Sequence, residues 1–165
     1  MSVGDVALTL LVDAAHLEAH RRDFVVPIRR VLAYVARALV TRGPGVRRLA
    51  GRDGPGSAMR WLEVPEVVGW AGVIRAGPRA FWGYRLGRAT PSHLVHGRKR
   101  RTRRLTLYGT WEAPRRFRLR TVYAGNPTPR EIHDPSIPPR ELDAAIAFWG
   151  AHAIVVRRGD YTRAP

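Results

Sequence analysis

The sequence of 165 residues contains no cysteine, so it has no disulfide bond, no thiolate metal ligand and no cysteine nucleophile. A chain of this length is expected to form one domain, with at most a small appended element, and to bury a core without covalent cross-links. The lack of cysteine is compatible with a reducing compartment, and we expect a cytoplasmic protein.

Long apolar runs are also missing. Residues 6–12 are interrupted by a threonine, flanked by two aspartates and not preceded by a basic region, so they predict neither a signal peptide nor a membrane span. Residues 64–74 are the next most apolar stretch, but they contain Glu66 and are too short to cross a bilayer. We therefore expect a soluble protein with no membrane partner.

Motifs for nucleotide or ester hydrolysis are absent, since no GxxxxGK[ST], GxGxxG or GxSxG pattern occurs. His16 and His20 stand four apart, but HLEAH lacks the HExxH order and has no evident third metal ligand. A second set would bind a metal only if the fold brought its members together: His93, His96, His133, Asp134 and His152. We expect no metal and no cofactor.

One segment almost lacks acidic residues. Between Arg85 and Arg130 there are 13 arginines or lysines and one acid, Glu112, so +12 of the net charge of +16 lies in about a quarter of the chain. This concentration is typical of proteins that bind a polyanion, because basic side chains release the counterions condensed on phosphates. A GC-rich genome or a hot habitat would explain why Lys99 is the single lysine, but not why acids are missing here.

The N-terminal region has helical periodicity. Residues 13–23 predict a short helix. Residues 25–40 predict a longer one, because their apolar side chains recur at helical spacing and Pro27 suits the first turn. Gly-Pro-Gly at residues 43–45 is expected to end it.

Residues 41–57 contain five glycines and two prolines and predict a linker or a long loop. We place the one internal boundary there. The chain is thus divided into an N-terminal helical element with its linker, residues 1–57, and a basic α+β domain, residues 58–165.

The second region has short strands and one helix. Residues 59–74 provide core side chains, including Trp61 and Trp70, from either a helix or a strand. The later elements are a strand at 81–86, a hairpin at 105–111 and 117–123, a proline-rich loop, a helix at 139–149 and a strand at 153–156. The helix has Leu142, Ile146 and Trp149 on one side, and the tail from Arg157 is expected to fray.

These elements predict an α+β fold, in which N-terminal helices precede a twisted antiparallel sheet and a C-terminal helix packs on that sheet. Strict alternation gives the hairpin an inward face made of Leu105, Leu107, Gly109, Trp111, Phe117, Leu119, Thr121 and Tyr123. The opposite face then carries Tyr108, Arg118 and Arg120, with threonines. Guanidinium groups bind phosphate and an aromatic ring stacks on a base, so this face suits a polyanion; the alternative is an ordinary solvated sheet face.

A basic run at residues 98–104 has six arginines or lysines in seven positions. The alternatives are a localisation-like signal, an electrostatic tether to acidic lipid, and a docking patch for an acidic protein. Its place inside the domain, between His96 and a strand, favours an ordered loop that binds nucleic acid. The residues assigned to that role are Arg85, Arg88, Ser92, Arg98, Lys99, Arg100, Arg101, Arg103, Arg104 and Arg118.

Two histidines stand just before this run, in PSHLVHG, where a proline and a serine are expected to break the chain. A metal-free ribonuclease needs a base for the 2′-OH proton, an acid for the leaving 5′-oxygen and cations for the phosphorane. Histidine suits the first two roles and arginine the third. The candidate catalytic set is His93, His96 and Arg120, with Tyr108 as an auxiliary donor. The alternative is that each histidine has a structural or surface role.

The order of parts over residues 80–156 resembles small bacterial ribonuclease toxins of the barnase, EndoU, colicin and RelE-like superfamily. The resemblance is carried by a helical lead-in, a histidine-bearing turn, the basic segment, and the segments LRTVYAG, REIHDPSI and FWGAHAIVV. It implies a twisted antiparallel sheet packed on helices, metal-free RNA cleavage leaving a 2′,3′-cyclic phosphate, and an acidic neutralising partner. Thr121 and Tyr123 lie in the strand where such enzymes often carry active groups, in conflict with the alternation.

We therefore predict a protein that binds RNA through the basic run and the polar hairpin face, and cleaves it. One rival is a non-catalytic RNA- or DNA-binding protein, such as a ribosome-associated factor. Another is a module whose basic face docks an acidic protein, for example an antitoxin or immunity protein.

Overall fold

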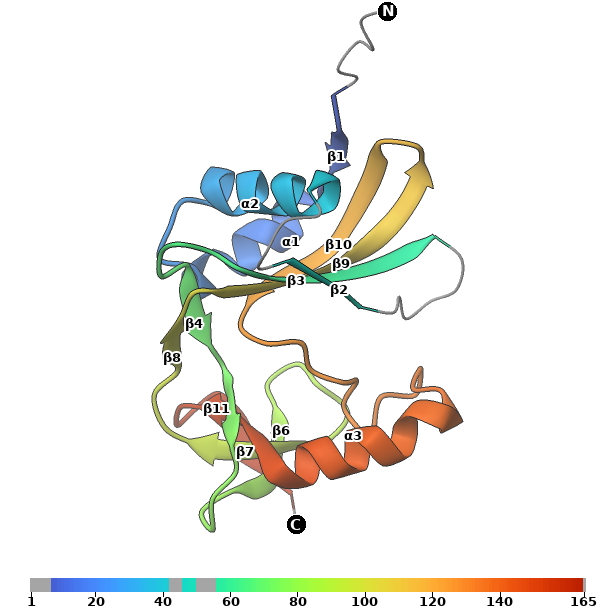
Figure 1. Cartoon of the computed structure of the whole chain (residues 1–165). Coiled ribbons are helices and arrows are strands. Elements are labelled where there is room, and N and C mark those ends of the chain that lie inside the picture. The colour runs from blue at the N-terminus through green and yellow to red at the C-terminus, as the bar shows by residue number, and fades with distance from the viewer. Residues whose placement is uncertain (1–6, 42–45, 50–55, 165) are drawn as a thin grey trace, which may run out of the picture. The chain divides into compact units, whose positions relative to one another are not determined.

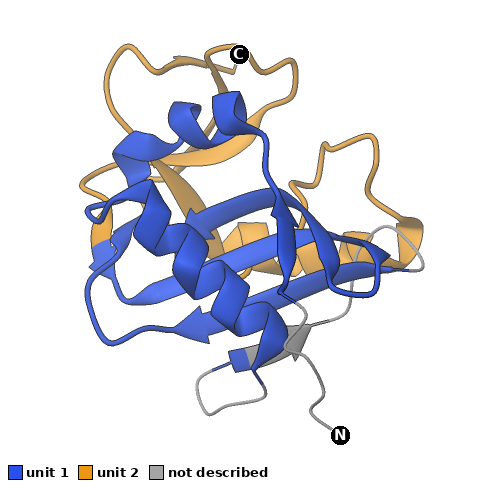
Figure 2. Ribbon diagram, turned by 90° about the horizontal axis from the view of Figure 1, so that it is seen from above, with its two compact units in different colours: residues 1–71, 101–126 blue, residues 72–100, 127–165 orange. Residues whose placement is uncertain are grey.

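In the computed structural model, residues 7–41, 46–49 and 56–164 are described, and the chain forms two compact units (Figure 1, Figure 2). Unit 1 is drawn from residues 1–71 and 101–126, and unit 2 from residues 72–100 and 127–165. The described residues include three α-helices and several mainly antiparallel sheets, which confirms the predicted mixture of α and β structure.

The helices of unit 1 lie where the sequence predicts them. α1 (Ala14–Ala19) begins after Asp13, whose carboxylate accepts a hydrogen bond of 3.0 Å from the backbone N–H of His16. A 3₁₀ turn, η1 (Arg21–Asp23), follows. α2 (Ile28–Val40) begins after Pro27, whose fixed backbone angle suits a helix start. The helix end predicted at residues 43–45 lies outside the described residues.

Unit 1 contains a five-stranded sheet in the order β1–β10–β9–β3–β2. Its strands are β1 (Thr9–Leu11), β2 (Val46–Leu49), β3 (Ser57–Glu63), β9 (Arg104–Ala113) and β10 (Arg116–Ala124). β1 pairs with β10 in parallel and the other pairs are antiparallel, so the predicted hairpin, β9 and β10, is confirmed.

The prediction of a linker or loop over residues 41–57 is wrong for residues 46–49, which form β2. These four residues pair with β3 in an antiparallel register, because the edge of β3 offers them backbone partners that glycine-rich composition does not reveal. The remaining parts of that prediction, residues 42–45 and 50–55, lie outside the described residues.

The core of unit 1 lies between the helices and one face of this sheet (Figure 1). Val31, Val35 and Leu39 of α2 are buried at the predicted helical spacing. The buried partners on the strands and loops include Leu62, Val64, Val68, Leu105, Leu107, Phe117, Leu119 and Val122. Within unit 1, no described helix covers the other face of the sheet.

A β-bulge in β10 decides which side chains turn toward that core. The register leaves Arg120 as an extra residue between the paired positions Leu119 and Thr121. Beyond it the alternation reverses, so that Val122 is buried and Thr121 and Tyr123 lie on the opposite face. The prediction that Thr121 and Tyr123 point inward is therefore wrong, because strict alternation contains no bulge.

Unit 2 contains a second five-stranded sheet, in the order β12–β6–β7–β11–β5. Its strands are β5 (Val73–Arg75), β6 (Phe81–Arg85), β7 (Ser92–His96), β11 (His152–Val156) and β12 (Tyr161–Arg163). β7 and β11 are parallel and the other pairs antiparallel. The frayed tail predicted from Arg157 is wrong, because β12 pairs with β6. A separate two-stranded sheet pairs β4 (Gly69–Ala71) with β8 (Arg100–Thr102).

The helix of unit 2, α3 (Pro139–Ala151), begins at the predicted proline and runs directly into β11. Ala145 and Trp149 are buried, and the Trp149 indole donates a 2.9 Å hydrogen bond to the carbonyl of Arg130. Ile146 is 50% exposed, so its predicted place on the packed side is wrong; the small Ala145 takes that place. No helix in the described part of the chain is long and apolar enough to span a membrane.

Candidate RNA-binding surface and histidine cluster

The four residues proposed from the sequence as a catalytic set are grouped in two pairs. Tyr108 and Arg120 lie on the hairpin of unit 1, and His93 and His96 lie on β7 of unit 2. The sequence predicted that Pro91 and Ser92 would interrupt regular structure before His93. That prediction is wrong for Ser92, because this residue begins β7. Side chains three apart on a strand point to opposite faces of the sheet, so the two histidines do not share a site.

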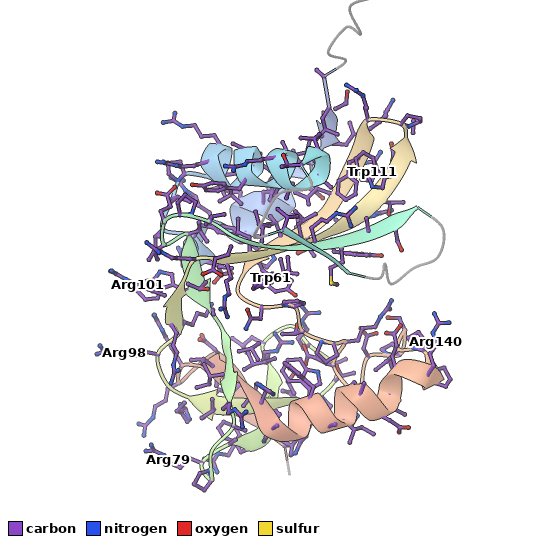
Figure 3. The ribbon with its side chains drawn as sticks, in the orientation of Figure 1. Trp61, Arg79, Arg98, Arg101, Trp111 and Arg140 are labelled. Atoms are coloured by element: carbon purple, nitrogen blue, oxygen red, sulfur yellow. The ribbon has the colours of Figure 1, made fainter. Side chains whose placement is uncertain are left out.

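The basic run is exposed, but it is only partly a loop. β8 and the start of β9 occupy four of its seven positions, which corrects the prediction of a loop over residues 98–104. Figure 3 shows the side chains of Arg98 and Arg101 directed away from the ribbon. By unit, Arg101, Arg103, Arg104 and Arg118 belong to unit 1, and Arg85, Arg88, Ser92, Arg98, Lys99 and Arg100 belong to unit 2.

Two arginines of this run lie over tryptophan rings. The guanidinium carbon of Arg101 is 5.2 Å from the ring centre of Trp70, and that of Arg104 is 5.4 Å from the ring centre of Trp61. Both distances fall within the range of cation–π contacts. Trp61 and Trp70 are half-buried, so their assignment as core residues is corrected: each is the platform for an arginine.

Asn126 ties one of these pairs together. Its side-chain oxygen accepts hydrogen bonds of 3.2 Å from the Trp61 indole N–H and of 3.2 Å from an Arg104 Nη1. The guanidinium is thereby held over the indole, which reduces the rotamer freedom that it would lose on binding a ligand.

Trp61 begins a row of side chains across the sheet face that the unit 1 helices leave uncovered. The register places Trp61, Thr106 and Tyr123 opposite one another on β3, β9 and β10, and Tyr108 next to Thr121 in the adjoining row. In Figure 3 Trp61 lies on the side of β3 away from α2. Thr106 is one of the threonines predicted on the polar hairpin face, but it is fully buried, and its hydroxyl donates a 2.9 Å hydrogen bond to the Gly125 carbonyl.

The arginines of the hairpin differ in their partners. Arg118 donates a hydrogen bond to Glu112, and the Arg116 Nε lies 3.3 Å from the same carboxylate. The hydrogen bond from Arg118 lowers the pKa of Glu112, with smaller contributions from the charges of both arginines. Among the described residues, Arg101, Arg103 and Arg120 have no acidic partner. Their charge is therefore available to an anionic ligand.

In unit 2 two of the predicted phosphate contacts bind a carboxylate instead. Arg85 donates to Glu131, and the Ser92 hydroxyl donates to the other oxygen of the same carboxylate. The Arg85 Nε also donates to the Ser92 hydroxyl at 3.3 Å. Ser92 is only 2% exposed. This closed cluster joins β6 and β7 to the loop at residues 127–138, and the charge of Arg85 is matched there by the Glu131 carboxylate.

His93 has a fixed orientation in unit 2. Its Nδ1 lies 2.6 Å from the carbonyl oxygen of Trp149 and 2.8 Å from that of His152, at the end of α3. Because carbonyl oxygens only accept hydrogen bonds, Nδ1 carries a proton. In the neutral ring Nε2 is then the acceptor, and no hydrogen-bond partner for Nε2 occurs among the described residues.

Trp82 lies against this imidazole. The two residues are directly paired across β6 and β7, and their rings stack at 5.0 Å with an angle of 21°. His133 contacts the same indole edge-on, at 5.7 Å. Trp82 is 38% exposed, a large value for a residue that is usually buried.

His96, on the other face, has aromatic neighbours of its own. Its Nε2 is hydrogen-bonded to the Tyr161 hydroxyl, and its ring centre lies 5.6 Å from that of Phe81. Arg163 lies over the Phe81 ring at 4.8 Å. These contacts hold β12 on the sheet, which is a structural role.

A metal site is not evident in the described part of the chain, since no group of three or more histidines or acids there is placed to hold an ion. His16 and His20 contact each other with ring centres 4.7 Å apart, and the His20 Nδ1 lies 3.3 Å from Asp23. The two rings and one carboxylate form a local cluster within α1 and η1.

The sequence pattern did not single out Trp82, and it indicated His133 only as a possible metal ligand. Trp82 lies in a largely apolar strand, where a tryptophan is usually part of the core. Its pairing with His93 joins two distant segments, so it could not be read from the sequence. His133 lies within the quoted segment REIHDPSI, and the polar residues around it were the available signal.

No protein-family model, curated protein or solved structure matches this chain. Function must therefore be inferred from the geometry of the two units.

Proposed function

We propose that this protein binds single-stranded RNA through the polar sheet face of unit 1 and the arginines that border it. The observation that carries the proposal is the pair of arginines that lie over tryptophan rings, Arg104 over Trp61 and Arg101 over Trp70. An arginine that is held in place without a carboxylate partner keeps its charge available for phosphate.

The cross-strand row that contains Trp61 supports the proposal that the ligand is single-stranded. Trp61 and Tyr123 lie in one cross-strand row, with Tyr108 in the next, and aromatic rings on a sheet face stack on unpaired bases. Thr121 in the adjoining row offers a hydroxyl within the same face, which suits the additional 2′-OH of RNA.

Metal-independent RNA cleavage is the second part of the proposal. It consists of attack by the 2′-OH to leave a 2′,3′-cyclic phosphate, and it is supported by the resemblance to small bacterial ribonuclease toxins. With it come the further expectations of that resemblance: N-terminal helices followed by a twisted antiparallel sheet with a C-terminal helix packed on it, action in the cytoplasm, and an acidic antitoxin or immunity protein as partner.

Binding is tested with a labelled single-stranded RNA and a DNA of the same sequence, at ~150 mM salt and with EDTA, because affinities depend on salt. Trp61→Leu is expected to lower the affinity for RNA roughly 5- to 150-fold, which is what the loss of about 1–3 kcal/mol of stacking on one base gives. Arg104→Gln is expected to lower the affinity and to flatten the salt dependence by about 0.7 in slope for each lost phosphate contact.

Arg29→Gln is the matched control. It removes the same charge from the exposed side of α2, on the helical side of unit 1. Equal losses for Arg104→Gln and Arg29→Gln would show a non-specific charge effect and refute the surface. Equal affinity for RNA and DNA would favour a general nucleic-acid binder. Absence of retention on either, with capture of an acidic protein, would favour the docking module.

A further inference from the structure

The RNA-binding surface proposed for unit 1 makes no use of the cluster formed by Trp82, His93 and His133 in unit 2. This cluster brings together two imidazoles and one exposed indole from three separate segments: β6, β7 and the loop at residues 127–138. Titratable rings that meet at an exposed aromatic platform are candidates for chemistry on a ligand that stacks.

Two features fix the imidazole of His93. The carbonyl oxygens at the end of α3 hold the proton on Nδ1, and the cross-strand indole of Trp82 holds the plane of the ring. A histidine that must act as a base needs this arrangement, because the second nitrogen fixes the tautomer that leaves Nε2 able to accept a proton.

The loop that carries His133 is held at several points. Within the loop, Glu131 binds Arg85 and Ser92. The Asp134 carboxylate then accepts hydrogen bonds from Ser136, of 2.8 Å from the backbone N–H and 2.6 Å from the hydroxyl. His133 itself is exposed, and its ring contact is with Trp82. The second imidazole is thus accessible on an ordered loop.

We propose that His93 and His133 are the two proton-transfer residues of RNA cleavage, and that Trp82 holds a nucleobase beside them. This inference rests on the proposed function, and it replaces the pair formed by His93 and His96. His96 lies on the opposite sheet face, bound to Tyr161, and takes no part in the reaction.

The reaction is balanced with the groups present. Neutral His93 accepts the 2′-OH proton at Nε2 while the 2′-oxygen forms a bond to phosphorus. The bond from phosphorus to the 5′-oxygen breaks, and protonated His133 donates a proton to that oxygen. The products are a 2′,3′-cyclic phosphate and a free 5′-OH. His93 then releases its extra proton to water and His133 takes up a proton from water, which restores both histidines. No oxidant, reductant or metal is consumed.

The experiment measures cleavage and binding separately in the full chain. Cleavage is followed with labelled RNA in EDTA, and binding with a 2′-O-methyl RNA of the same sequence, which has no nucleophilic hydroxyl. His133→Ala is expected to slow cleavage by about 10²–10⁴, the usual contribution of one general acid or base, with little change in binding of the 2′-O-methyl RNA. His93→Gln is expected to have an effect of the same size.

His96→Ala is the matched control, because it removes a histidine from the same strand but from the other face. It is expected to leave the cleavage rate within about threefold of wild type, well below the effect of losing a general acid or base. Thermal melting separates a chemical effect from unfolding. His133→Ala is the stronger test, since the exposed ring makes no hydrogen bond among the described residues.

The pH profile gives a second readout that a structural role would not change. A bell-shaped dependence is expected for wild-type cleavage, with one limb lost in His133→Ala and the other in His93→Gln. Trp82→Leu is expected to raise KM more than it lowers kcat, because it removes the stacking platform and leaves both imidazoles in place.

The outcomes separate the two proposals. If 2′-O-methyl RNA binds but RNA is not cleaved, the cleavage site is refuted and the binding proposal stands. The cleavage site is also refuted if EDTA abolishes cleavage, if His133→Ala cleaves at the wild-type rate, or if His96→Ala is the inactive variant. If neither RNA binds, the proposed function itself is refuted.

Discussion

The contacts that stabilise the interior of unit 1 differ from those that stabilise the interior of unit 2. Of the described hydrophobic residues that are buried, 17 belong to unit 1 and seven to unit 2. Unit 2 has fewer buried apolar side chains, and two sets of polar contacts join its distant segments: the cluster of Arg85, Ser92 and Glu131, and the bonds from His93 to the end of α3. We infer that unit 1 depends mainly on apolar packing, whereas unit 2 depends more on hydrogen bonds and charge.

The aromatic side chains of the two units also have different partners. In unit 1, tryptophans lie under the arginines of the basic run, and in unit 2 an exposed tryptophan contacts two histidines. Arginine keeps its charge at any physiological pH, while histidine changes its protonation state. This contrast is the basis for proposing ligand binding in unit 1 and proton transfer in unit 2.

The largest effect is expected in the core of unit 1. Phe117 is fully buried; its ring contacts Trp111 edge-on at 5.0 Å and packs on Gly109, where an added Cβ would lie 2.6 Å from the ring. Phe117→Ala is expected to lower the free energy of unfolding by about 3–5 kcal/mol, through lost transfer energy and the cavity left behind. Urea unfolding followed by tryptophan fluorescence measures the change.

The control for this variant is Val40→Ala, at a side chain of α2 that is 64% exposed. It is expected to change the free energy of unfolding by no more than about 0.5 kcal/mol. A loss below about 1 kcal/mol for Phe117→Ala would mean that the site collapses without a cavity, against the view that apolar packing dominates unit 1.

A smaller effect is expected from the polar cluster of unit 2. Glu131→Ala leaves the buried Ser92 hydroxyl and the Arg85 guanidinium without their carboxylate, and side chains there are about a quarter exposed, at 25% for Arg85 and 28% for Glu131. An unsatisfied buried group costs about 1–3 kcal/mol, and this exposure places the expected loss in the lower half of that range.

Hydrogen exchange at the backbone N–H groups of the loop at residues 127–138 is the direct measurement, because local opening precedes global unfolding. The control is Asp143→Ala, which removes the same charge from an exposed position on α3. Equal exchange rates in the two variants would show that Glu131 does not hold the loop, and the contrast between the units would then fail.

The sequence predicted the elements with strong periodicity. α2 and the hairpin follow directly from apolar spacing at 3.6 and at two residues, and the proline at the start of α3 marks its boundary. Local patterns of this kind need no knowledge of distant partners. The concentration of arginine around β8 and β9 was equally visible, because charge is a property of composition.

Features that depend on pairing between distant strands could not be predicted. The bulge at Arg120 reverses the faces of Thr121 and Tyr123, and neither residue differs in type from one that points inward. The separation of His93 from His96 required knowing that they lie on a strand. The partner of Arg85 is Glu131, 46 residues away, and a basic residue near a basic run gives no sign of it.

The smallest effect concerns the exposed polar pair at the end of the hairpin in unit 1. The hydrogen bond from Arg118 lowers the pKa of Glu112 below its usual value of 4.5. A lowered carboxyl pKa in the folded state means that the stabilisation is present above pH 4.5 and is lost as the pH falls through the lowered value. At a solvated surface this contribution to stability is small.

The pKa of Glu112 can be measured by following its side-chain carboxyl carbon by NMR during an acid titration. Arg118→Gln is expected to raise that pKa toward its usual value, because the hydrogen bond is the largest cause of the shift. Arg116→Gln is expected to raise it less, since this Nε lies 3.3 Å from the carboxylate and contributes mainly through its charge. If the pKa of Glu112 rose in Arg118→Gln while the stability at acid pH matched that of wild type, charge pairing would be confirmed as a minor contribution to the stability of unit 1. A large loss of acid stability would show instead that both units depend on polar contacts.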